Sequence, residues 1–165
     1  MKQSGWILGG LLLAGGWAWS QEGGTYHGDP IPPELEAAYV RGVNFLVRQQ
    51  QQDGNWENSR GQNGPAVTAL ALLAILAHGD DPNYGAYAAT CRRAVAALIK
   101  GQNAANGYMG NSMYHHGFAT LALAESYGVV DDPRIGPALQ KAVDLILTSQ
   151  AHNRHAAWRF HRQIL

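Results

Sequence analysis

Apolar residues recur at helical spacing in three separate segments of the chain. In the first segment, Leu35, Tyr39, Val43 and Leu46 stand at i, i+4, i+8 and i+11. This spacing predicts an amphipathic helix that turns one face toward a core. The same pattern recurs twice further along, at Tyr84, Tyr87, Cys91, Val95 and Leu98, and at Ile135, Leu139, Val143 and Ile146.

A second kind of segment lies between these amphipathic ones. Residues 66–77 are apolar almost all round, and TALALLAILAHGDDP (68–82) aligns with TLALAESYGVVDDP (120–133). A helix without a polar face is expected to be buried on every side. Each of the first two amphipathic helices is therefore paired with an apolar one. Stacking such pairs predicts an all-α fold with an outer and an inner layer.

The pairs form a repeat marked by glutamine. Gln50, Gln102 and Gln150 occupy matching positions, 52 and then 48 residues apart. An aromatic residue closes each copy, and a turn pair precedes it in the first two. The aromatic residues are Trp56, Tyr108 and Trp158, and the turn glycines are Gly54 and Gly107. The third copy has Ala156-Ala157 in place of the glycine and is the weakest of the three.

The run QQQQDGNW (49–56) is therefore interpreted as the end of an outer helix rather than as a polar tract. Asp53-Gly54 has turn chemistry, because glycine adopts positive φ at little steric cost. A glutamine amide carries both donor and acceptor and can satisfy main-chain groups at a helix end. We expect Trp56 to pack back over that end.

A helix ending in Gln, a DG-type turn and a Trp, repeated about every fifty residues, resembles the QW-type repeat of the prenyltransferase and squalene–hopene cyclase superfamily. QQQQDGNW followed by GPAVTALALLAIL carries the resemblance most specifically. It implies a partial α/α toroid over residues 34–158, with repeats at about 34–82, 83–133 and 134–158 and a tail at 159–165. That amounts to two full helical hairpins and the first helix of a third. It also implies that Gln50 and Trp56 stabilise helix ends and take no part in chemistry.

Enzymatic motifs of that superfamily are not found in the sequence. Squalene-type cyclases use a DxDD motif, which this chain lacks. Asp80-Asp81-Pro82 and Asp131-Asp132-Pro133 recur in the same loop of two repeats, which favours a turn or cap over catalysis. Cys91 is the only cysteine and falls on an apolar stripe, so we interpret it as a small core residue. We predict no metal and no cofactor.

Two histidine clusters are the remaining candidates for chemistry. Tyr114, His115 and His116 precede the second apolar helix, where the resemblance places one mouth of a central cavity. They are the predicted ligand contacts, and a structural role is the alternative. The other cluster is His152, His155 and His161. Its first two members have the spacing of metal ligands on a helix but fall in the loop of the third repeat, which argues against a metal site.

The N-terminus carries the pattern of a secretory signal peptide. Lys2 precedes an uncharged apolar run at 5–19, and small residues precede a polar start at Gln21. This predicts a signal peptide at 1–20, a flexible lead-in at 21–33 and export. The alternative is an uncleaved membrane anchor. With 12 basic and 12 acidic residues there is no excess charge that would favour nucleic acid.

Together these features predict an exported, non-catalytic repeat module that binds a partner or an apolar ligand through its inner helical face. The partner could be another chain that completes the toroid, or a second copy. The alternative is a fragment of a terpene cyclase or prenyltransferase-type enzyme whose catalytic half lies elsewhere.

Overall fold

The computed structural model describes residues 31–58 and 64–151. The chain divides into two units, residues 1–32 and 33–165, and every described helix belongs to the second. Its helices are α1 (Pro33–Gln49), α2 (Pro65–Leu76), α3 (Ala88–Lys100), α4 (Met113–Ser126) and α5 (Ile135–Ala151). Within the described ranges there is no strand, only one isolated bridge between Gln102 and Met109. The all-α prediction is confirmed for this part of the chain.

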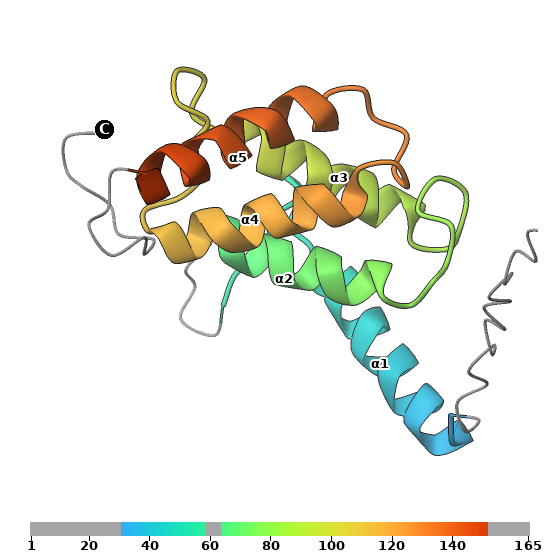
Figure 1. Ribbon diagram of the computed structural model, residues 1–165. Coiled ribbons are helices and arrows are strands. Elements are labelled where there is room, and N and C mark those ends of the chain that lie inside the picture. The colour runs from blue at the N-terminus through green and yellow to red at the C-terminus, as the bar shows by residue number, and fades with distance from the viewer. Residues whose placement is uncertain (1–30, 59–63, 152–165) are drawn as a thin grey trace, which may run out of the picture. The chain divides into compact units, whose positions relative to one another are not determined.

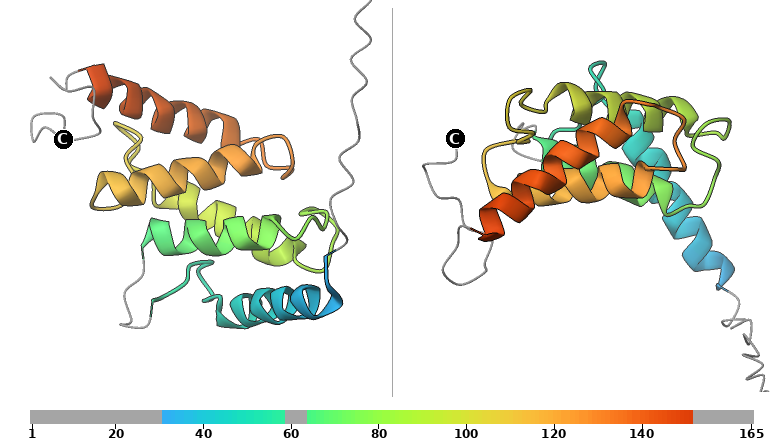
Figure 2. Two further views of the ribbon diagram at one scale, coloured as in Figure 1. Left: turned by 60° about the horizontal axis from the view of Figure 1, so that its bottom comes forward. Right: turned by 45° about the horizontal axis from the view of Figure 1, so that its top comes forward.

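α2 and α4 form the centre of the helical arrangement, and each of the other helices packs on one or both of them. α2 and α4 lie side by side and run in the same direction, α3 lies behind them, and both α3 and α5 run the opposite way (Figure 1). α4 lies between α2 and α5 (Figure 2, left). α1 is joined to α2 by the Tyr39 hydroxyl, which donates to the carbonyl oxygen of Ala74 at 2.6 Å. We call α2 and α4 the inner helices and α1, α3 and α5 the outer helices. The alternation of the two kinds gives a repeat-like fold.

The apolar sequence of the inner helices predicts that they are buried on every side. In the structure each of them has an exposed face. Ala69 and Leu72 of α2 and Ala119 and Leu123 of α4 are fully buried. On the opposite face, Leu121 is 45% exposed, and further apolar side chains of both helices are also exposed. Each inner helix therefore leaves one face open, because nothing covers that face among the described residues.

The outer helix in the middle is the most completely packed. Cys91, Val95 and Leu98 of α3 are all buried, in line with the predicted stripe. The matching residues of α5, Leu139, Val143 and Ile146, are only half-buried. The reason is that α3 packs against both α2 and α4, whereas α5 packs against α4 and not against α2. Tyr84 and Tyr87, predicted on the same helical stripe, precede α3 instead, and Tyr84 is 88% exposed. The helical spacing extended by chance into a loop.

Gln50 connects the first loop to the next outer helix. Its Nε2 donates to the carbonyl oxygen of Gly54 at 3.1 Å and to that of Thr90, in α3, at 3.0 Å. Its Oε1 accepts from Nε of Arg93 at 3.0 Å. The sequence predicts that this amide satisfies groups at its own helix end. The structure differs, because the amide also bonds sideways to the following repeat.

Gln102 makes the same two main-chain contacts one repeat later. Its Nε2 donates to the carbonyl oxygens of Gly107 at 3.0 Å and Ala138, in α5, at 2.9 Å. We call this pair of bonds, from one glutamine to its own loop and to the next outer helix, the glutamine bridge. Gln150 stands at the corresponding place on α5 and is exposed.

The turn glycines allow each loop to lie directly on the following outer helix. Gly54 has φ +88°, and a Cβ there would stand 2.3 Å from the carbonyl oxygen of Arg93. Gly107 has φ +77°, and a Cβ would stand 2.6 Å from the carbonyl oxygen of Lys141. Any side chain at either position would separate the loop from the helix. The glycines are thus required by close approach as well as by turn geometry.

Trp56 lies over the end of α1. The side chain is buried, and its indole Nε1 donates to the carbonyl oxygen of Leu46 at 2.8 Å. That oxygen belongs to the last turn of α1, where main-chain acceptors lack helical partners. The side chain therefore caps the helix end.

Tyr108 does not match Trp56 in the structure, although the sequence alignment pairs them. The second loop has one more residue between its glutamine and its glycine. Asn55 and Tyr108 consequently occupy the same place, since their carbonyl oxygens accept from the residues that follow Gln50 and Gln102. The buried counterpart of Trp56 is Met109. A one-residue insertion shifted the register and left the tyrosine half-buried beside it.

At the opposite end of the repeats, asparagine replaces glutamine. Nδ2 of Asn83 donates to the carbonyl oxygen of Val129 at 2.8 Å, and its Oδ1 accepts from the Asp131 amide at 2.7 Å. These bonds join the loop after α2 to the loop after α4. Oδ1 of Asp81 accepts from the Asn83 amide at 2.8 Å.

The second Asp-Asp-Pro segment has the same turn chemistry. Oδ1 of Asp132 accepts from the Arg134 amide at 3.0 Å. The turn role predicted for these segments therefore agrees with the structure. Pro82 and Pro133 do not begin helices, however, because α3 starts at Ala88 and α5 at Ile135.

Several predictions fall outside the described residues. They are the signal peptide at 1–20, most of the lead-in, and the C-terminal residues His152, His155, Trp158 and His161. Among the helices that are described, none is long and apolar enough to cross a membrane.

Candidate functional site

The exposed face of α4 carries an apolar depression. It is lined by Met113, Tyr114, Gly117, Phe118 and Leu121. The Tyr114 and Phe118 rings meet edge to face, with centroids 4.7 Å apart, and Tyr114 is 69% exposed. The depression offers aromatic and aliphatic surface to solvent with little polar surface.

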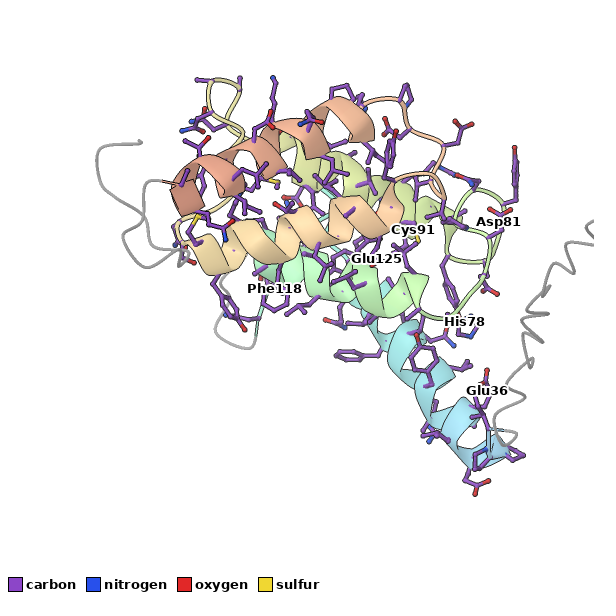
Figure 3. All side chains as sticks on the ribbon, in the orientation of Figure 1. Glu36, His78, Asp81, Cys91, Phe118 and Glu125 are labelled. Carbon is purple, nitrogen blue, oxygen red and sulfur yellow. The ribbon has the colours of Figure 1, made fainter. Side chains whose placement is uncertain are left out.

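Helical spacing explains why these side chains share one face. Residues 114, 118, 121 and 125 stand at i, i+4, i+7 and i+11 along α4. The register is set by Ser112, whose Oγ accepts from the His115 amide at 3.3 Å and caps the first turn. Phe118 lies toward the start of this row and Glu125 toward its end (Figure 3).

Next to the apolar depression lies a second one with acidic groups. It is lined by Leu73 and Leu76 of α2, by Leu121 and Glu125 of α4, and by the loop after α2 with Asp80 and Asp81. The two depressions meet at Leu121, which lines both. None of the residues that line the second is basic.

The helix ends add to this negative character. α2 ends at Leu76 and α4 at Ser126, both beside the acidic depression. A helix C-terminus carries partial negative charge and favours cations. Combined with Glu125, Asp80 and Asp81, it makes this end of the inner face a favourable place for a positive group.

His116, a predicted ligand contact, lies in the core and lines neither depression. It is fully buried, and its Nδ1 accepts from the Met109 amide at 3.2 Å. Since Nδ1 accepts, Nε2 carries the proton and donates to the carbonyl oxygen of Ala142 at 3.0 Å. Burial lowers the pKa of this imidazole, against the opposing effect of the Ala142 bond. A neutral histidine that is buried in the core and makes two hydrogen bonds has a structural role.

His115 faces neither depression. Its ring lies beside Gly64, where an added Cβ would be 3.3 Å from Cε1 of the ring. Gly110 is also close, and an added Cβ there would be 2.5 Å from the Cβ of His115. Of the three predicted ligand contacts, only Tyr114 lines the candidate site.

The rings of Tyr39, His78 and Tyr87 form a cluster next to the acidic depression that the sequence analysis did not predict. The His78 ring stacks on Tyr39 at 5.6 Å and meets Tyr87 edge-on at 5.5 Å. Its Nδ1 lies 3.3 Å from a carboxylate oxygen of Asp80. The cluster holds the loop after α2 against α1 and the start of α3. Helical spacing places Tyr39 on a core face, but no local pattern indicates that His78 meets it.

Cys91 behaves as the core residue that the sequence predicts. It is buried among apolar side chains, and this burial raises the pKa of its thiol to about 11. Across the described ranges, no group of three or more His, Cys, Asp and Glu side chains is arranged to hold a metal ion.

Comparison of the chain with protein-family models, with curated proteins and with solved structures finds no match. The resemblance to prenyltransferase and squalene–hopene cyclase repeats therefore depends on the glutamine, glycine and tryptophan pattern of the sequence itself.

Proposed function

We propose that this protein is an exported helical-repeat module that binds an apolar ligand, or an apolar segment of a partner, through its inner helical face. The observation that carries the proposal is the pair of joined depressions on α2 and α4. Soluble proteins leave contiguous apolar surface exposed chiefly where something binds. Here aromatic and leucine side chains line one depression, and they continue through Leu121 into the other.

The arrangement also favours one class of ligand. A molecule whose apolar part covers Phe118 and Leu121 brings its other end to Glu125, about 10 Å along the helix at 1.5 Å per residue. There it meets three carboxylates and two helix C-termini. An apolar ligand with a positively charged end therefore fits this face better than a neutral or an anionic one.

The glutamine pattern supports a partial α/α toroid as the architecture of the module. Two glutamine bridges, in successive repeats, connect the loop after one outer helix to the next outer helix. In this proposal the inner face of the toroid is the binding face, and the Gln, Gly and Trp residues are structural.

Binding of a neutral fluorescent dye such as Nile red to the purified protein tests the face. Leu121→Ser should weaken dye binding several-fold. The matched control is Leu147→Ser on α5, because Leu147 is also exposed, at 56%, but lines neither depression. Equal binding by the two variants would contradict the proposal.

Competition with amphiphiles tests the charge preference. Below their micellar concentrations, decyltrimethylammonium should displace the dye more effectively than decanol, and decanol more effectively than decyl sulfate. Glu125→Gln should reduce this difference, whereas Glu34→Gln, on the exposed start of α1, should not. Equal competition by all three compounds would support the apolar site and contradict its preference for positive charge.

A further inference from the structure

Two of the outer helices bury a face under the loop of the preceding repeat. On α3 this face consists of Thr90, Ala94 and Ala97, which lie beneath the loop that contains Gly54. On α5 it consists of Ala138, Ala142 and Leu145, beneath the loop that contains Gly107. The residues next to the loop are mostly small, so the main chain of the loop can approach the helix.

α1 carries the same face, and none of the described residues covers it. The 52-residue spacing that matches Gln50 with Gln102 also matches Ala38, Gly42 and Phe45 with the face of α3. All three are exposed, and Phe45 is 55% exposed. A Cβ added to Gly42 would have no neighbour within 4 Å in the part of the chain that the structure describes.

Nothing among the described residues accounts for Gly42. It stands in the middle of a 17-residue helix, where glycine costs about 0.5–1 kcal/mol relative to alanine. Its equivalents Ala94 and Ala142 are fully buried under loops. Because glycine lets another main chain approach closely, such an approach would account for Gly42.

The basic residue of this face is also present. Arg93 donates to Oε1 of Gln50 at 3.0 Å, and Nζ of Lys141 lies 3.5 Å from the carbonyl oxygen of Ala104. Each of these groups reaches an acceptor in the preceding loop. Arg41 stands at the matching position of α1 and is exposed.

We infer that this face of α1, formed by Ala38, Arg41, Gly42 and Phe45, docks a second copy of the chain, head to tail. The docking element is the end of α5 with Gln150. This glutamine stands where Gln50 and Gln102 form their bridges, and its side chain is exposed. Within the chain, the segment that follows α1 covers α3, and the segment that follows α3 covers α5. The proposed contact would repeat this packing between α5 of one molecule and α1 of the next.

Such a contact is heterologous, because each copy uses a different surface on each side. Repetition of it gives either a closed ring or an open filament. The inner faces of successive copies would then form one continuous surface. The inference is independent of what that surface binds.

Sedimentation over a range of protein concentrations tests the inference. The wild-type chain should associate as its concentration rises. Gly42→Gln should weaken association roughly tenfold or more, which corresponds to about 1.4 kcal/mol. Its monomer should be as stable as wild type, since the space around Gly42 is open. A wild-type chain that stays monomeric would overturn the inference.

The matched control is Ala37→Gln. Ala37 is exposed on α1, and its equivalents Ala89 and Pro137 are exposed as well, so no loop covers this position in any repeat. The variant should associate like wild type. Weakening by both variants would indicate a general effect of altering α1 and would count against the proposed face.

Mixing two defective variants tests the polarity of the contact. Gly42→Gln retains an intact α5 end, and Gln150→Ala retains an intact α1 face. Each alone should stay monomeric, while an equimolar mixture should form a dimer and nothing larger. A symmetric interface through α1 would give no such complementation, and that result would also overturn the inference.

Discussion

Gln50 and Gln102 make the same two main-chain hydrogen bonds in successive repeats, one to their own loop and one to the next outer helix. The acceptors in the following helices, Thr90 and Ala138, both lie in the first turns of α3 and α5. The glutamine therefore fixes where each outer helix starts relative to the loop before it.

Replacing Gln50 tests the contribution of this bridge to stability. Gln50→Ala removes the two main-chain bonds and leaves Arg93 without its amide acceptor. We expect a loss of about 1–3 kcal/mol in the free energy of unfolding, measured by urea denaturation. Gln51→Ala is the control, because its side chain is exposed, and it should change stability by less than about 0.5 kcal/mol. Similar losses in both variants would mean that the bridge is not a specific stabilising contact.

Replacing Gly54 separates backbone strain from close approach. Gly54→Ala places a methyl group against the Arg93 carbonyl and also strains a residue with φ +88°. Gly79 has the same φ of +88° but no neighbour within 4 Å of an added Cβ. Gly79→Ala should therefore cost only the backbone term, about 1–2 kcal/mol. Gly54→Ala should cost about 1–3 kcal/mol more, measured as a shift in the urea midpoint.

His116 should make the fold sensitive to acid. Its pKa in the folded state lies below the ordinary value of 6.5, so the unfolded chain binds a proton more readily than the folded one. Its contribution to stability is complete above that value and decreases as the pH falls through it toward the folded pKa. The measurement is urea denaturation from neutral to mildly acidic pH. His116→Gln should be less stable at neutral pH but should lose less stability than wild type across this window. Parallel pH curves for the two proteins would contradict the assignment.

Cys91 should report on opening of the core. Burial raises the pKa of the thiol to about 11 and encloses it among apolar side chains, so the native protein should react very slowly with iodoacetamide at neutral pH. In denaturing urea the reaction should reach the rate of a free thiol. Fast native labelling, followed by mass spectrometry, would show that α3 is not the closed centre of the fold.

Periodicity was sufficient to predict the helices themselves. The apolar spacing at Val43 and Val95 depends on contacts that every amphipathic helix makes with its core, and these leave a local pattern. The glutamine spacing likewise indicated that Gln50 and Gln102 share a role. It could not show that both bond to the following repeat, because that partner is about forty residues away.

The candidate site was predicted less well, for reasons that lie in tertiary packing. Local sequence marks His115 and His116 as adjacent and chemically similar, yet the helix turns one into the core and the other toward Gly64 and Gly110. The acidic depression combines Glu125 with Asp80 and Asp81 from another repeat. Glu125 is too far along the sequence from Asp80 and Asp81 for a local pattern to include all three. Each carboxylate, taken by itself, resembles an ordinary surface residue.

The glutamine bridge ends on main-chain oxygens, not on side chains. Thr90 and Ala138 receive their bonds through carbonyl groups that every amino acid possesses. Substitution at either position would leave the acceptor in place as long as the helix persists. The connection between repeats therefore imposes few demands on the residues of the neighbour, and the outward surfaces of the helices are free to diverge while the stacking geometry is preserved.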